Sequence, residues 1–247
     1  MDHLKLYKTL TNSIRVPFYV MGALLLLLWG LLWVWFLTNQ TGPTGSLVAH
    51  FRAVGVQAAL WFVLTANCLQ VMAFMGISSY LAAYLMHTYR LSAGATALPL
   101  VVAGCGVIGG SLVGGRVAGQ ACRVPVVALA FVGGGCGAAL MFMTDISPWV
   151  TVLLAFGVAG LLPLSWPVTA VLLTELAGQS RATATGLFAV SNQLGAVGGA
   201  SLGGVMLALG SFPLVGMFCL VTAALAAGVL CGKVQRAIAS PLPLSPS

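Results

Sequence analysis

The chain has 247 residues, of which 60% are hydrophobic and only 5% are charged. Soluble domains carry about 25% charged residues, and the acids here are just Asp2, Asp145 and Glu175. The composition excludes a soluble globular protein and predicts an integral membrane protein. The net charge of +7 does not indicate nucleic-acid binding, because no face clusters Lys and Arg. The scattered basic residues instead mark topology beside an anionic membrane face.

Apolar stretches between short polar turns predict an all-α integral membrane fold with seven transmembrane helices. One crossing takes about 20 apolar residues, and the uncharged run 182–232 is long enough for two crossings around a Gly-Ser-Phe-Pro turn. We expect three regions: a polar tail, first helix and cytoplasmic linker over 1–53, a six-helix bundle over 54–232, and a disordered cytoplasmic tail over 233–247. The predicted helices cover residues 18–37, 54–86, 95–115, 124–143, 149–174, 182–209 and 212–231.

Two of these helices carry glycine at every fourth position, which places the glycines on one helical face. In a bilayer, such a face lets a second helix approach closely and gain dispersion energy. We therefore predict two packing faces, made by Gly106, Gly110 and Gly114 and by Gly195, Gly199 and Gly203.

The predicted helix 149–174 is interrupted by Pro163 and Pro167. Each proline removes a backbone donor, so we expect a kink. Two interpretations stay open: the bend is a gate, or it is a static kink that fits curved packing.

The basic residues predict the orientation of the chain. Seven crossings place the termini on opposite sides, and the C-terminal side carries six basic residues against one in a loop on the other side, which predicts a cytoplasmic C-terminus. The basic N-terminal tail would then lie outside, so we expect that the chain lacks upstream helices that would orient its first span. On the C-terminal side are Arg52, Arg116, Arg123, Arg181, Lys233 and Arg236, and on the other side is Arg90.

Three short segments have distinctive patterns: GRVAGQACR at residues 115–123, RATATG at residues 181–186 followed by Asn192 and the glycine face, and RVPF at residues 15–18. They resemble segments of the drug:proton antiporter branch of the major facilitator superfamily. The first is similar to that family's basic loop, the second to its eleventh helix, and the third to the entry to its sixth helix. The resemblance implies that the last six helices form the C-terminal six-helix half of that fold. The family has an acid and a central arginine where this chain has Gly119 and Gln120. The loop motif comprises Gly115, Arg116 and Arg123, and we expect Arg116 and Arg123 to hold the loop at the cytoplasmic face.

Polar side chains inside the predicted helices are the candidate substrate contacts, because buried polar groups in a bilayer need partners or a water-filled cavity. In the family, the equivalent helices face the central cavity. The alternative is that these side chains only bond neighbouring helices together, each bond contributing about 0.6 to 2 kcal/mol. The candidates are Asn67, Gln70, Tyr84, Asn192 and Gln193, together with Phe74, which lies on the same helical stripe as Asn67 and Gln70.

Enzymatic chemistry is not indicated. The six cysteines lack metal-ligand spacing and are interpreted as buried free thiols, and no nucleophile is paired with a base. We expect no catalytic residue, no metal and no cofactor.

We therefore predict a partial secondary transporter in the plasma membrane, or bacterial inner membrane, that exports small organic or drug-like molecules by alternating access. Its predicted partners are membrane lipid, a small-molecule substrate, and a missing N-terminal half or a second copy of the chain, with no nucleic acid. Two alternatives stay open: an inactive truncated fragment, and a seven-helix receptor or scaffold that does not transport.

Overall fold

The computed structural model describes residues 57–234, together with residues 23, 26–28, 30 and 31. These few residues before position 57 are helical and belong to one compact unit, residues 1–46. The bundle described below belongs to a second unit, residues 47–247. The remainder of the predicted segment 1–53, including Arg15 and Arg52, and the tail from residue 235 lie outside the described residues.

The described part of the chain is helical throughout and contains no strand, which confirms the predicted all-α class for these residues. Short turns join seven helices, and a 3₁₀ turn precedes α8 while a π turn follows α9. The elements are α3 (Ala58–Thr88), α4 (Ala97–Ala118), α5 (Arg123–Met143), α6 (Pro148–Leu161), α7 (Ser165–Ala177), η1 (Gly178–Ser180), α8 (Arg181–Ala208), α9 (Phe212–Val229) and η2 (Leu230–Val234).

Five of the described segments are long and apolar enough to cross a membrane. They are α3, α4, α5, the run Pro148–Ala177 that contains α6 and α7, and Phe212–Gly232. The remaining long helix, α8, has 28 residues, but its glycines, hydroxyls and amides keep its hydropathy below that of the others. The structure therefore supports a membrane-embedded helical protein, and the count of seven crossings stays a prediction.

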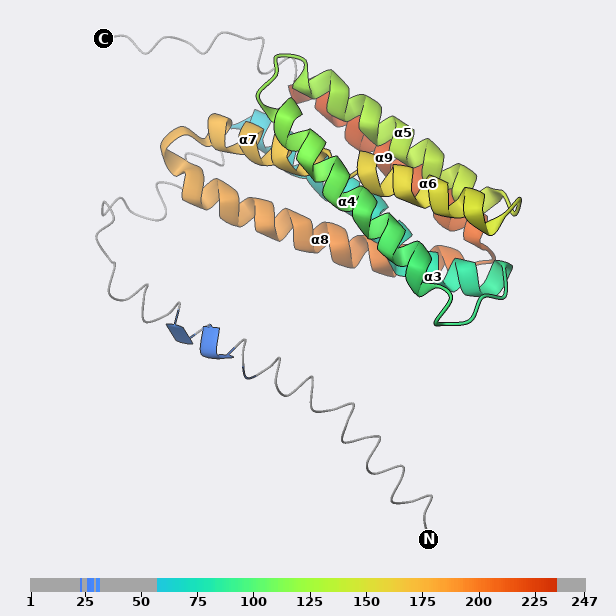
Figure 1. Cartoon of the computed structure of the whole chain (residues 1–247). Coiled ribbons are helices and arrows are strands. Elements are labelled where there is room, and N and C mark those ends of the chain that lie inside the picture. The colour runs from blue at the N-terminus through green and yellow to red at the C-terminus, as the bar shows by residue number, and fades with distance from the viewer. Residues whose placement is uncertain (1–22, 24–25, 29, 32–56, 235–247) are drawn as a thin grey trace, which may run out of the picture. The chain divides into compact units, whose positions relative to one another are not determined.

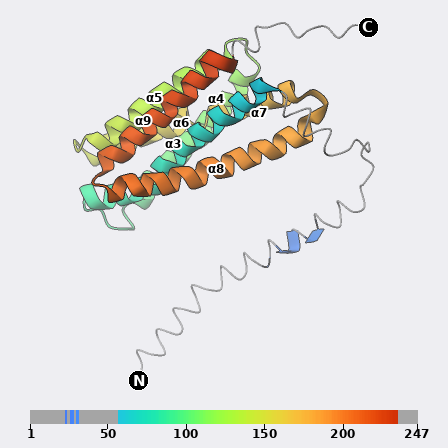
Figure 2. The same cartoon turned by 180° about the vertical axis from the view of Figure 1, so that it is seen from behind.

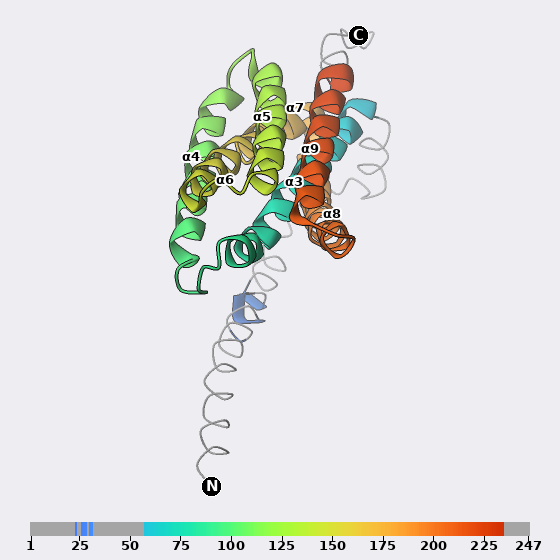
Figure 3. The ribbon, with the colours of Figure 1, turned by 90° about the vertical axis from the view of Figure 1, so that its right-hand side faces the viewer.

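The helix α3 lies at the centre of the bundle and packs against α7, α8 and α9. The pairs α5–α9 and α4–α6 are also in extensive contact, as the three views show (Figures 1, 2 and 3). Much of the buried apolar surface surrounds α3, including Leu60, Val63 and Leu85, which are fully buried.

The connections alternate between the two ends of the bundle. The α4–α5 and α7–α8 connections lie with the end of α9 at one end, and the α3–α4, α5–α6 and α8–α9 turns lie at the other (Figure 1). Arg116, Arg123 and Arg181 belong to the first end, which we call the basic end. Arg90 and Asp145 belong to the opposite end.

The glycine face of α4 lies against the backbone of the α6–α7 segment. A Cβ atom at Gly106 or Gly110 would collide with the carbonyl oxygen of Phe156 or Gly160, and one at Gly114 would collide with that of Leu164. The two helices approach this closely only because no side chain separates them.

The glycine face of α8 lies against α3 in the same way. A Cβ atom at Gly195 would lie 2.6 Å from the carbonyl oxygen of Cys68, and one at Gly199 would collide with that of Met72. A Cβ atom at Gly203 would lie 2.7 Å from the ring of Tyr80. Residues 68, 72 and 80 are spaced by multiples of four, so one face of α3 receives the whole glycine row.

The predicted helix 149–174 is two helices, α6 and α7, separated by a turn at residues 162–164. The break lies at Pro163, which has no N–H to continue the helical ladder. The next two backbone bonds, from Ser165 N to Leu162 O at 3.3 Å and from Trp166 N to Pro163 O at 3.0 Å, each span only three residues. Pro167 produces no kink of its own, because it lies in the first turn of α7, where backbone N–H groups have no intrahelical partner.

Candidate functional site

The break between α6 and α7 is covered by a buried amide from α3. Gln70 is fully buried and its Nε2 donates to the carbonyl oxygen of Leu162 at 3.1 Å. The same oxygen accepts the Ser165 hydroxyl at 2.9 Å. In an unbroken helix this carbonyl would accept the N–H of Trp166. Here it accepts the N–H of Ser165 at 3.3 Å instead, and the two side chains add to that longer bond.

One turn earlier on α3, Asn67 connects α3 to α8. Its side chain is 1% exposed, and its Nδ2 lies 2.8 Å from both the Ser191 hydroxyl and the Asn192 Oδ1. Ser191 in turn donates to the carbonyl oxygen of Phe188 at 2.8 Å. The two predicted residues Asn67 and Asn192 are therefore in direct contact, and the contact is of the helix-to-helix kind that the alternative interpretation describes.

Three buried polar atoms beside these bonds have no hydrogen-bond partner within the described residues: Asn67 Oδ1, Gln70 Oε1 and Trp166 Nε1. The Trp166 ring packs edge-on against Phe74, with centroids 5.4 Å apart and planes at 82°. Asn67, Gln70 and Phe74 follow one stripe of α3. Unpaired buried polar atoms are costly in apolar surroundings. The two amide oxygens on this stripe and the indole N–H of Trp166 on α7 are therefore candidate acceptors and a candidate donor for a ligand.

An apolar hollow of about 200 Å³ adjoins this polar cluster. It lies between α3, α4 and α6, and Phe74 is part of its wall as well as the contact of Trp166. Ser78, one turn further along α3, also lines it, while the other lining residues are apolar or glycine. The cluster and the hollow meet at Phe74, so the unpaired atoms of Asn67, Gln70 and Trp166 lie beside the hollow without lining it. We call the cluster and the hollow together the break site.

Two predicted substrate contacts lie away from the break site. Tyr84 is ten residues beyond Phe74 on α3, about 15 Å along the helix axis, and its hydroxyl donates to Asp145 Oδ1 at 2.9 Å. Gln193 is exposed on the outer surface of α8. The structure thus brings Asn67, Gln70, Phe74 and Asn192 together around the α3 stripe and leaves Tyr84 and Gln193 apart from them.

The sequence reasoning did not assign Trp166 and Ser191 to the site. Trp166 lies between the two prolines, so its position at a helix break was readable from the sequence. The contact of Ser191 with Asn67 depends on how α3 and α8 are aligned, for which the sequence carries no local signal.

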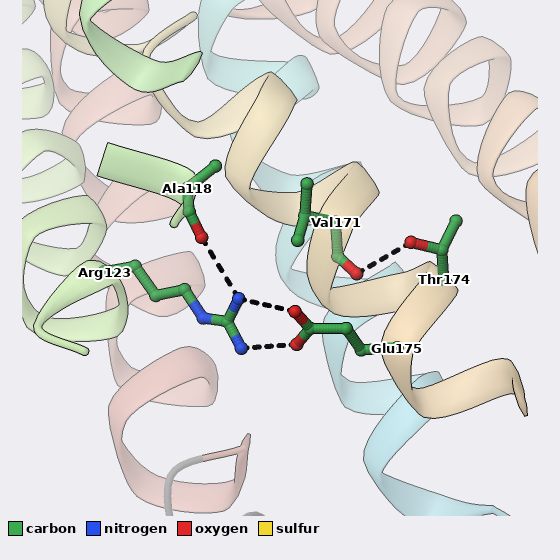
Figure 4. A network of polar contacts seen from close by, with 5 residues as sticks. All are labelled: Ala118, Arg123, Val171, Thr174 and Glu175. Carbon is green, nitrogen blue, oxygen red and sulfur yellow. Dashed lines mark hydrogen bonds and ion pairs between the residues drawn. The ribbon is translucent and has the colours of Figure 1, made fainter. Parts of the chain in front are cut away.

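The predicted basic loop is tied to α7 by an ion pair (Figure 4). The Arg123 guanidinium donates from Nη1 to Glu175 Oε1 at 3.0 Å, and its Nη2 contacts the other carboxylate oxygen. Nη1 also donates to the carbonyl oxygen of Ala118, at 3.1 Å. The predicted helix ended at residue 174, but Glu175 lies in the last turn of α7, because a helix continues through a polar residue as long as its backbone bonds are made.

The other two residues of the loop motif make no comparable contact. Arg116 is exposed in the last turn of α4, and Gly115 faces open space. Arg123 is therefore the motif residue that fixes the α4–α5 connection to the rest of the bundle.

The described residues contain no group of three His, Cys, Asp or Glu side chains placed to hold a metal ion. The amides and the indole of the break site do not titrate near neutral pH, so the break site is suited to hydrogen bonding and apolar contact. No protein-family model, curated protein or solved structure matches the chain.

Proposed function

We propose that the chain is one half of a secondary transporter of the major facilitator type, and that it moves small, largely apolar organic molecules across the plasma membrane by alternating access. The sequence resemblance of residues 115–123 and 181–186 suggests the family. The break site is the structural observation that supports transport as the activity.

Secondary transporters bind substrate near the bilayer midplane beside helices that are interrupted there, because the interrupted backbone and nearby side chains supply polar contacts. Gln70 is close to the middle of α3, a 31-residue helix, and it contacts the break at Leu162. The hollow beside Phe74 supplies apolar surface, and the unpaired atoms of Gln70 and Trp166 supply one acceptor and one donor. An uncharged or largely apolar organic molecule with a single polar group fits this combination.

On this proposal α8 is a crossing helix whose outer face meets protein. Its exposed Gln193 lies near the helix centre, where contact with lipid is unfavourable for an amide. A missing N-terminal half or a second copy of the chain would cover this face and complete the transport path. The basic end, with Arg116, Arg123 and Arg181, faces the cytoplasm by the positive-inside rule.

Binding tests the proposal first. Ligand-induced changes in tryptophan fluorescence are measured on the purified chain with a set of small aromatic amides and alcohols. We expect a saturable change that is lost in Trp166→Phe and kept in Trp149→Phe, because Trp149 is exposed on α6. A change that survives in Trp166→Phe would remove the break site from the proposal.

Transport is then measured on sealed vesicles containing the chain, with a ligand identified by the binding assay. Flux that is abolished in Gln70→Leu supports the transporter. Saturable binding without flux by the chain alone would support the alternative of a truncated fragment, and absence of both would favour a non-transporting membrane scaffold.

A further inference from the structure

A second hollow, of about 510 Å³, lies at the end of the bundle opposite the basic end. It is formed where the last turn of α3, the end of α5 and the α8–α9 turn meet, and its wall includes Tyr84, His87, Phe142, Asp145 and Phe212. This hollow is separate from the break site: the two share no lining residue.

Asp145 provides a negative charge at the rim of this hollow. Its Oδ1 accepts the hydroxyl of Tyr84, which is 1% exposed, at 2.9 Å. The ion pair between Arg123 and Glu175 is the one found among the described residues, so no described Lys, Arg or His is paired with Asp145. Arg90 belongs to the same end but does not line the hollow.

Aromatic rings form a connected wall beside this carboxylate. The Tyr84 ring lies edge-on to Phe142 and Phe212, with centroids 5.1 and 5.2 Å apart. Phe142 and Phe212 are nearly parallel at 6.2 Å, and the His87 ring lies 5.6 Å from Phe212. Aromatic faces attract cations through their quadrupole, and clusters of such rings are used to bind quaternary ammonium groups.

We propose that this hollow binds an organic ammonium ion, with Asp145 as the counter-ion and the rings of Tyr84, Phe142 and Phe212 as the apolar wall. The Tyr84 hydroxyl fixes the carboxylate at the rim, so the charge is held in place before the ligand arrives. This inference goes beyond the proposed transport function and is tested independently of it.

The ammonium group has two possible sources with the same chemistry: a free organic cation in the aqueous phase, and the headgroup of a zwitterionic lipid. Both place a positive nitrogen with alkyl substituents beside Asp145. The experiment separates them by the lipid composition around the protein.

The probe is benzyltrimethylammonium, titrated calorimetrically into the full chain in nanodiscs of phosphatidylglycerol. We expect saturable binding that is weakened by at least about tenfold in Asp145→Asn, because that variant keeps the size and the acceptor but loses the charge. Glu175→Gln is the charge-matched control. It lies at the other end of the bundle, beyond the screening length in salt, and should change the affinity by less than about twofold.

A second variant keeps the proposal falsifiable if Asp145→Asn is poorly folded. Met143 is exposed at the hollow's wall, so Met143→Trp should fill the hollow and reduce binding while leaving the thermal unfolding temperature unchanged. Failure of the wild-type chain to bind saturably, or equal affinity in the wild type and in folded Asp145→Asn, would overturn the proposal.

The lipid arm repeats the titration in nanodiscs that contain phosphatidylcholine. Weaker apparent binding there identifies the lipid headgroup as a competing occupant, and unchanged binding identifies a free cation as the ligand. Both results support the ammonium site and assign its source.

Discussion

Gln70 donates its side-chain amide to the carbonyl oxygen of Leu162, 3.1 Å away and at the point where the α6–α7 helix is broken. At the break the Trp166 N–H bonds to the Pro163 carbonyl, and the Leu162 carbonyl accepts the Ser165 N–H at 3.3 Å as well as the Ser165 hydroxyl. A polar residue of α3 therefore adds a hydrogen bond to the backbone of a different helix at its break, and the oxygen of the same amide is unpaired.

Replacing Gln70 separates the two roles of this amide. Gln70→Leu removes the bond to Leu162 but also removes the unpaired Oε1, and Ser165 still donates to the carbonyl, so we expect a loss of at most about 1 kcal/mol in stability. Ligand binding at the break site should be abolished. Thermal unfolding in detergent and tryptophan fluorescence titration measure the two effects. A lower unfolding temperature with unchanged ligand affinity would show that Gln70 is a purely structural residue.

The glycine face of α4 allows a matched pair of substitutions at adjacent positions. Gly110→Ala places a Cβ against the carbonyl group of Gly160, whereas Gly109→Ala adds one in open space. We expect Gly110→Ala to force α4 and α6 apart and to cost about 1–3 kcal/mol, the range for overpacking, and Gly109→Ala to stay within about 0.5 kcal/mol of the wild type. Unfolding in a denaturing detergent series compares them; equal stabilities would contradict the close α4–α6 contact.

The ion pair between Arg123 and Glu175 should contribute little to stability. The Glu175 side chain is 52% exposed, and exposed pairs are worth about 0.2–1 kcal/mol. A double-mutant cycle of Arg123→Gln and Glu175→Gln should give a coupling energy in that range, decreasing as salt is raised. Arg123→Lys keeps the charge but cannot form the bidentate contact, so most of the coupling should be lost in that variant too. A coupling that is independent of salt would show that the pair is shielded from solvent.

The helices and their packing faces were largely predictable from the sequence. The rows at Gly106, Gly110 and Gly114 and at Gly195, Gly199 and Gly203 have the four-residue period of a helix, and the period alone places each row on one face. The break at Pro163 was also readable, since proline cannot continue a helical ladder. These features depend on residues that are close together in the chain.

The site could not be predicted to the same degree, because its contacts join distant segments. Asn67 contacts Ser191 and Asn192 because α3 and α8 are aligned in this register. No local sequence pattern predicts that register. Tyr84 was grouped with the substrate contacts because it lies on α3, yet its partner is Asp145 in the α5–α6 turn. The C-terminal end of α7 was also predicted wrongly, at residue 174, whereas the helix ends at Ala177. The charge of Glu175 ends the apolar run in the sequence, but it does not end the helix.

The orientation of the bundle can be read from a cysteine that the chain already has. Cys122 is exposed in the α4–α5 connection at the basic end, so the positive-inside rule places it in the cytoplasm. In intact cells, a membrane-impermeant maleimide should fail to label Cys122, and labelling should appear only after permeabilisation. A cysteine introduced by Ser92→Cys in the exposed α3–α4 turn should be labelled without permeabilisation. Cys122→Ser in the same background identifies the signal.

Labelling of both positions from the same side would contradict a transmembrane α4, and the reverse pattern would place the basic end outside and the proposed ammonium site in the cytoplasm.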